Sequence, residues 1–162
     1  MDDATYDPNF KYDVASQPGA GQVKVCYACG TCTAGCPVAE VDERFSPRRI
    51  IRQILLGQRR ATLSSELLWY CETCYTCSAY CPQNVKFGDV MRALREMAIA
   101  EGYYSRDLAE RIRRVDRLAH AIRLELVRAA LNAPEVPLPS ALEETLGAIA
   151  TRIQTLEETL DG

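Results

Sequence analysis

The chain contains one cysteine pattern twice, as Cys26-Tyr-Ala-Cys-Gly-Thr-Cys-Thr-Ala-Gly-Cys-Pro37 and as Cys71-Glu-Thr-Cys-Tyr-Thr-Cys-Ser-Ala-Tyr-Cys-Pro82. The two stretches lie 45 residues apart and agree at seven of twelve positions. We call them the first and second cysteine arrays. Each has the form C-x2-C-x2-C-x3-C-P, and together they use all eight cysteines of the chain: Cys26, Cys29, Cys32, Cys36, Cys71, Cys74, Cys77 and Cys81.

This spacing is the one with which two-cluster ferredoxins hold a pair of [4Fe-4S] clusters. Three thiolates at intervals of three residues reach one cluster. The fourth, followed by a proline that fixes φ, is directed away from its own array and usually binds the other cluster. We therefore expect two clusters with crossed ligands. The first is bound by Cys26, Cys29, Cys32 and Cys81, and the second by Cys71, Cys74, Cys77 and Cys36.

Two other uses of the cysteines must be considered. Two zinc ions with four thiolates each would also use all eight, but zinc sites usually have well-separated C-x2-C pairs. Disulfides would require export to an oxidising compartment. The first seven residues are acidic and have no apolar segment behind them, which predicts neither a signal peptide nor a transit peptide. We therefore expect metal clusters in a cytoplasmic protein.

Composition excludes several other classes of function. The 162 residues include 19 basic and 22 acidic side chains, for a net charge of −3, so the chain lacks the positive bias of a nucleic-acid binder. The longest uncharged stretch, residues 25–39, is too short and too rich in Gly and Cys to span a membrane. Residues 46–60 carry five arginines and no acid, and we interpret them as a solvated or protein-docking face.

Helix signals occupy the rest of the central region. Ser46 and Pro47 are a good helix start, and apolar residues follow until Gly57. A second short helix is expected from residue 64 or 65 to residue 70. A third is expected over 87–101, ending at Gly102. The sequence thus predicts an all-α fold: an α-helical ferredoxin-like dicluster module over residues 23–103, followed by a long helix over 104–131 that Ser105 caps.

The two ends of the chain are predicted from composition. Residues 1–22 are polar and contain two prolines, which predicts an extended N-terminal arm with one short extended piece from Phe10 to Val14. Two interpretations of this arm stay open: a frayed end of the chain and a segment that lies along a partner subunit. Residues 132–139 form a Pro-rich linker. Residues 140–162 carry apolar positions at heptad spacing, so the C-terminal helix either packs on its own domain or docks on a helix of another chain.

The remaining chemistry-bearing residues suggest electron transfer without catalysis. Five aromatic residues flank the cysteines and are expected to shield the clusters from water, and His120 is expected to be structural. All eight cysteines are used as ligands, and no nucleotide-binding loop is present, so we expect no catalytic residue. The shielding residues are Trp69, Tyr70, Tyr75, Tyr80 and Phe87.

The cysteine segments, Val25–Pro37 and Leu68–Pro82, resemble the C subunit of heterodisulfide reductase, over roughly residues 15–105. The resemblance implies that all eight cysteines are cluster ligands. It also implies that the chain passes electrons from a flavin-containing subunit to a catalytic one that cleaves a disulfide. Three alternatives stay open: a relay subunit of another soluble oxidoreductase complex, a free ferredoxin, and a zinc-stabilised adaptor. An iron–sulfur subunit of the succinate dehydrogenase type would also need a C-x4-C-x2-C run, which is absent.

Overall fold

The computed structural model describes residues 6–132. This part of the chain is built from helices and contains no strand, which confirms the predicted all-α class. None of the helices within it is long and apolar enough to cross a membrane. In chain order the elements are α1 (Phe10–Ala15), η1 (Gly21–Val25), α2 (Thr31–Ala34), α3 (Pro37–Val41), α4 (Pro47–Leu55), α5 (Arg59–Leu63), η2 (Glu66–Trp69), α6 (Thr76–Ala79), α7 (Phe87–Ala100) and α8 (Arg106–Asn132), where η marks a 3-10 helix.

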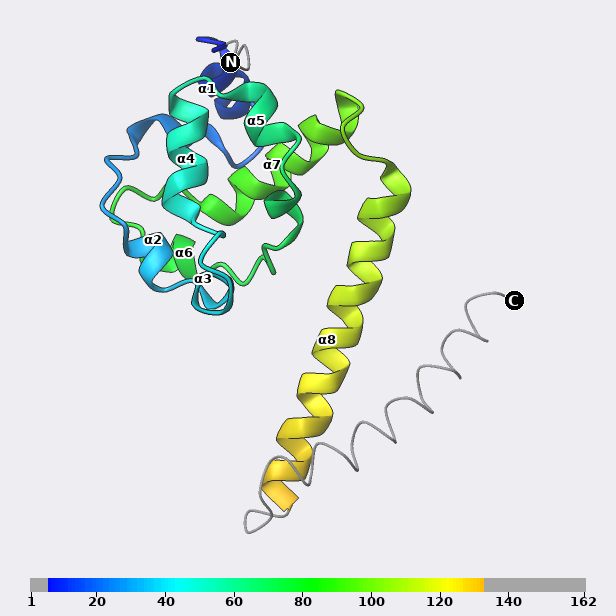
Figure 1. Cartoon of the computed structure of the whole chain (residues 1–162). Helices are drawn as coiled ribbons and strands as arrows, with labels where there is room; N and C mark the ends of the chain where they lie inside the picture. The colour runs from blue at the N-terminus through cyan, green and yellow to red at the C-terminus, as the bar shows by residue number, and fades with distance from the viewer. Residues whose placement is uncertain (1–5, 133–162) are drawn as a thin grey trace. The chain divides into compact units, whose positions relative to one another are not determined.

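The described residues fall into two units, which divide after Leu108. In the first unit, α1 and α5 pack against α7, whose buried face carries Val90, Met91 and Leu94, and α4 packs against α1 and α5. The short helices α2 and α6, which contain the middle of each cysteine array, pack against each other. Figure 1 shows them together at one end of this unit, with α1 and α5 toward the other end. The apolar core therefore supports the cysteine-bearing loops from one side.

Three helix boundaries agree with their sequence signals. Ser46 Oγ accepts the amide hydrogen of Arg49 (3.3 Å) at the start of α4, and Pro47 is its first residue. After α7, the chain leaves the helix through Gly102, which has a φ of +78°. Ser105 Oγ accepts the amide hydrogen of Leu108 (3.1 Å) at the start of α8. Local capping chemistry therefore sets these three boundaries.

Two elements between the arrays differ from expectation. The short helix before the second array is a 3-10 helix over Glu66–Trp69, with Ser65 at its start accepting the amide hydrogen of Leu67 (3.3 Å). The helix α5, over Arg59–Leu63, was not predicted. Its start has no side-chain cap, so its position depends on the burial of Leu63 and on contacts with α4 and α7.

The expected extended arm over residues 1–22 is wrong for residues 6–22, because these residues fold onto the first unit. Phe10 and Val14 are spaced one helical turn apart in α1 and both are fully buried. Burying a Phe side chain contributes about 1.5–3 kcal/mol, which outweighs the weak helix signal of so short a segment. The amide of Asp7 also donates to the carbonyl of Gly57 (2.8 Å). The predicted boundary at residue 23 therefore cuts through one compact unit.

Arg59 ties three parts of this unit together. Its guanidinium contacts the carboxylates of Asp7 (2.9 Å), Asp13 (2.6 Å) and Glu101 (2.6 Å). The Arg59 side chain is only 27% exposed, so solvent screens these pairs less than surface pairs. The N-terminal segment, α5 and the end of α7 are thereby joined, and one of the five arginines of residues 46–60 is structural.

The long helix predicted over residues 104–131 is α8. His120 lies exposed on it, with Nδ1 2.7 Å from the carbonyl oxygen of Asp116, a contact within the helix. Asn132, expected to begin the linker, is the last residue of α8. The rest of the predicted linker, 133–139, and the predicted heptad helix, 140–162, lie outside the described residues, and their packing stays a prediction.

Candidate metal centre

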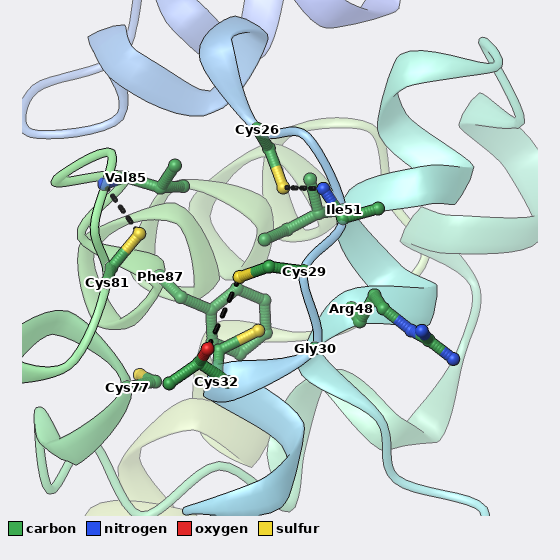
Figure 2. Close-up of a pocket in the computed structure, with 12 residues that line it drawn as sticks. Cys26, Cys29, Gly30, Cys32, Arg48, Ile51, Cys77, Cys81, Val85 and Phe87 are labelled. Atoms are coloured by element: carbon green, nitrogen blue, oxygen red, sulfur yellow. Dashed lines mark hydrogen bonds between the residues drawn. The ribbon is translucent and has the colours of Figure 1, made fainter.

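Two pockets of similar size lie among the cysteines, with empty volumes of about 360 and 320 Å³. The eight cysteines are all free thiols. The first pocket is lined by Cys26, Cys29, Cys32, Cys77 and Cys81, and the second by Cys36, Cys71, Cys74 and Cys77. Each pocket thus contains the first three cysteines of one array together with the last cysteine of the other, and Cys77 borders both (Figure 2 draws the first pocket).

The backbone of the two arrays follows the same repeat as the sequence. Ala28 and Thr73, which are 45 residues apart, both adopt a left-handed conformation, with φ of +59° and +56°. Gly30 and Tyr75 form a second such pair, at +92° and +61°. A non-glycine residue in this region costs about 1–3 kcal/mol and persists only where its surroundings require it. The loops are therefore held in a shape that aims the cysteines into the pockets.

Backbone and side-chain hydrogen-bonding groups surround the sulfurs. The amide of Ala28 donates to Cys26 Sγ (3.4 Å). The amide of Val85 donates to Cys81 Sγ (3.3 Å), as Figure 2 shows. Cys29 Sγ lies 3.4 Å from Thr31 Oγ1, and Cys74 Sγ lies 3.5 Å from Thr76 Oγ1. Such donors stabilise bound thiolates and tune the potential of a cluster. The sequence analysis assigned no role to these two threonines, although they occupy the same position in both arrays.

Two longer helices direct their N-termini at the pockets. The first turn of α4 places Pro47 in the wall of the second pocket and Arg48 in the wall of the first. The first turn of α7 places Phe87 in both walls and Gly88 in the second. The free amides at a helix N-terminus carry partial positive charge and favour an anion there. This applies to α7, which has no side-chain cap, because Pro47 has no amide hydrogen and the amides of Arg48 and Arg49 already donate to Thr33 and Ser46. The pockets are therefore suited to a negatively charged metal–thiolate group.

The protonation of the thiols differs between the cysteines. Burial raises the pKa of Cys71 to about 11 and also raises the pKa values of Cys32 and Cys77. The hydrogen bond with the Thr31 side chain lowers the pKa of the exposed Cys29. The buried thiols are therefore protonated near neutral pH, and a metal must displace their protons when it binds.

The distribution of the sulfurs suits a multi-iron cluster better than a single ion. Within residues 6–132, no three Cys, His, Asp or Glu side chains converge on a position for one metal ion. A tetrahedral zinc ion needs its ligand atoms about 2–2.3 Å from one point. A [4Fe-4S] cluster binds its thiolates at four separate irons, so the sulfurs are spread around a larger volume. The residues present therefore fit such a group.

The aromatic residues expected to shield the site do so only in part. Phe87 is 2% exposed and lines both pockets, and Tyr75 lines the second. Trp69 lines neither. It packs edge-on against Tyr104, with ring centroids 5.4 Å apart, and lies under the guanidinium of Arg95. Tyr70 and Tyr80 were also expected to shield the clusters, but their side chains lie outside both pockets.

The helical fold and the two cysteine-lined pockets define an α-helical ferredoxin-like dicluster module. In agreement, residues 22–85 match the family model described as a 4Fe-4S dicluster domain.

Known relatives identify the family within this class. The chain is 33% identical to the second iron-sulfur C subunit of the CoB--CoM heterodisulfide reductase of Methanocaldococcus jannaschii, over 83% of this chain and 74% of that protein. It is 35% identical to the C subunit of the ferredoxin:CoB-CoM heterodisulfide reductase of Methanosarcina mazei, over 78% and 83%. It is also 35% identical to the iron-sulfur C subunit of the Methanopyrus kandleri reductase, over 71% and 62%. The chain belongs to the family of heterodisulfide reductase C subunits, which confirms the resemblance found in its cysteine segments.

Proposed function

We propose that this chain carries two [4Fe-4S] clusters and relays electrons between a flavin-containing subunit and a catalytic subunit of a heterodisulfide reductase-like complex in the cytoplasm. The main support is the composition of the two pockets, because each combines three cysteines of one array with the last cysteine of the other. The names of the relatives, which are iron-sulfur or reductase C subunits, support the same assignment.

In this proposal the protein positions redox groups and performs no bond chemistry. A [4Fe-4S] cluster supplies one-electron redox chemistry when bound. The arrays hold eight thiolates, the amides of Ala28 and Val85 donate to them, and Phe87 keeps water from the wall between the pockets. Every cysteine lines a pocket, so none is left as a nucleophile.

The ligand assignment is part of the proposal. Cys26, Cys29, Cys32 and Cys81 hold the cluster of the first pocket. Cys77 also borders that pocket, but it belongs with the second cluster, because the first pocket already has four other cysteines. Without Cys77 the second pocket would have only three cysteines. Its cluster is therefore held by Cys36, Cys71, Cys74 and Cys77.

Anaerobic purification of the native protein tests the function. We expect brown material with about eight irons per chain, reversible reduction, and co-purification with a flavin-containing chain and a second iron–sulfur chain. Colourless material that contains zinc would contradict the proposal and identify the chain as a zinc-stabilised adaptor. A brown monomer without partners on gel filtration would replace it by a free ferredoxin. A brown complex with other redox subunits would support an electron-relay subunit of a different oxidoreductase complex.

A further inference from the structure

Three arginines form an exposed basic face at the start of α4, and we call Arg48, Arg49 and Arg52 the α4 basic face. Their positions i, i+1 and i+4 place them on one side of the helix. Among residues 6–132, no carboxylate makes an ion pair with any of them. The opposite side of the helix is buried in the core through Ile50, Ile51 and Ile54.

The α4 basic face adjoins the first pocket. Arg48 lines that pocket, and its amide donates to Thr33 Oγ1 of the first array (3.0 Å). A Cβ atom on Gly30 would lie 3.7 Å from Arg48 Nη1, so the arginine runs directly past the loop. Figure 2 shows its guanidinium pointing away from the cysteines and out beyond Gly30. Positive charge is thus presented to the outside next to the exposed Cys29.

The second pocket has a different border. Tyr75 occupies the position that Gly30 has in the first array, and its ring covers Gly88, where a Cβ atom would lie 3.0 Å from Tyr75 Cε1. The Tyr75 hydroxyl donates to Asp89 Oδ1 (3.3 Å). The charged residue in the wall of this pocket is Glu72, an acid. The charged residues in the walls of the two pockets therefore have opposite signs, which favours the approach of an acidic molecule at the first.

Building on the proposed function, we propose that the α4 basic face docks an acidic face of a redox-partner protein, which exchanges electrons with the first cluster. Arginine binds carboxylates through two parallel hydrogen bonds, and complementary charges steer encounter between proteins. Transfer moves one electron from the reduced centre of one protein to the oxidised centre of the other, without making or breaking a covalent bond. Tunnelling weakens steeply with distance, so docking beside the exposed Cys29 favours this route.

The test is a binding titration of the cluster-loaded chain with an oxidised acidic plant-type ferredoxin as the probe. Both proteins are oxidised, so binding is measured without electron flow. We expect binding at low salt that weakens as salt rises. Replacing the face by Arg48→Glu, Arg49→Glu and Arg52→Glu should weaken binding at least about tenfold. The neutral set Arg48→Gln, Arg49→Gln and Arg52→Gln should weaken it less.

The matched control reverses three other exposed helical arginines, Arg111, Arg114 and Arg117 of α8, which changes the net charge equally. It should retain most of the binding. Equal weakening by both triple variants, or no ferredoxin binding at low salt, would overturn the proposal. Tighter binding of a DNA duplex than of ferredoxin to the α4 basic face would also overturn it. Iron content and colour should be unchanged in a variant that carries only Arg49→Glu and Arg52→Glu, because neither residue lines a pocket. This double variant should still bind ferredoxin more weakly, so a failure of the docking face is distinguished from a chain that binds no clusters.

Discussion

The carbonyl of Gly57 accepts the amide hydrogen of Asp7 (2.8 Å), and a Cβ atom on Gly57 would overlap the backbone of Asp7. Gly57 has a φ of +77° and follows the end of α4. This contact fixes the segment before α1 against the core. The start of the first unit therefore requires a residue without a side chain at position 57.

We predict that Gly57→Ala strongly destabilises the protein. The left-handed conformation alone costs an L-residue about 1–2 kcal/mol, and the overlap with backbone adds about 1–3 kcal/mol. Gly102→Ala is the matched control, because Gly102 has a φ of +78° but nothing within 4 Å of the added Cβ. Anaerobic thermal unfolding of the cluster-loaded variants measures both. Equal losses in the two variants would show that the contact with Asp7 does not matter.

Crossed ligation predicts that Cys36→Ser changes the cluster of the second array. Cys36 lies in the pocket of Cys71 and Cys74, so its loss removes a ligand from them although it follows the first array. Cys81→Ser should change the other cluster. Electron paramagnetic resonance of the reduced variants distinguishes the two centres. A change confined to the cluster of the first array in Cys36→Ser contradicts the assignment.

Tyr75→Gly should raise the reduction potential of the second cluster. Removing the ring admits water, and water stabilises the more negative, reduced state of a cluster. The substitution also removes the backbone strain at φ +61°, so the stability lost with the ring is partly restored. Tyr80→Ala is the control, since Tyr80 is 65% exposed and lines neither pocket. A potentiometric titration of both variants checks this, and an unchanged second potential in Tyr75→Gly would be incompatible with shielding.

Arg59→Ala should destabilise the first unit by about 1–3 kcal/mol, because three carboxylates lose their common partner. Arg60→Ala, at the neighbouring exposed position, should change stability by no more than about 0.5 kcal/mol. Thermal unfolding under anaerobic conditions gives both values. The cluster spectra should be unaffected, because Arg59 lines neither pocket. A loss in Arg60→Ala as large as in Arg59→Ala would assign no special role to the three ion pairs.

Cluster assembly in the second pocket should depend more strongly on pH than assembly in the first. Iron binds the thiolate, and the Cys71 thiol, with its pKa of about 11, is protonated near neutral pH. Raising the pH toward this pKa increases the thiolate fraction about tenfold per unit, so assembly accelerates. In the first pocket, burial raises the pKa of Cys32, but the pKa of Cys29 is lowered, whereas in the second pocket the pKa values of Cys71 and Cys77 are both raised.

The pH dependence can be measured by iron–sulfur reconstitution between about pH 7 and about pH 8.5. Each of two variants keeps one pocket and has serine at the first three cysteines of the opposite array. The variant that keeps the second pocket should gain more in rate as the pH rises. Equal gains would show that the buried thiol does not limit assembly.

Local signals in the sequence predicted the parts of the structure that depend on neighbouring residues. The Ser46 cap, the Gly102 exit and the repeated arrays are of this kind, and so are the helices that they bound. Helix α1 was missed because Phe10 and Val14 are a short apolar pair in a polar segment, and only burial against distant residues makes them helical.

The site shows the same limit. The arrays indicated which cysteines belong together, but the sequence placed Phe87 merely near them, although it lines both pockets. Trp69 was expected at the clusters because it is close in sequence, whereas it packs on Tyr104. Which aromatic ring reaches a pocket depends on how α7 crosses the arrays, and such long-range packing leaves no mark in local spacing.

Phe87 and Cys77 each border both pockets, so the two pockets are separated by a single layer of side chains. Two charged centres at such close range repel each other more strongly in a protein interior than in water. Under the proposed function, an electron on the cluster of one pocket would make the arrival of another in the neighbouring pocket less favourable. This arrangement favours the transfer of one electron at a time, in which the protein releases one electron before it accepts the next.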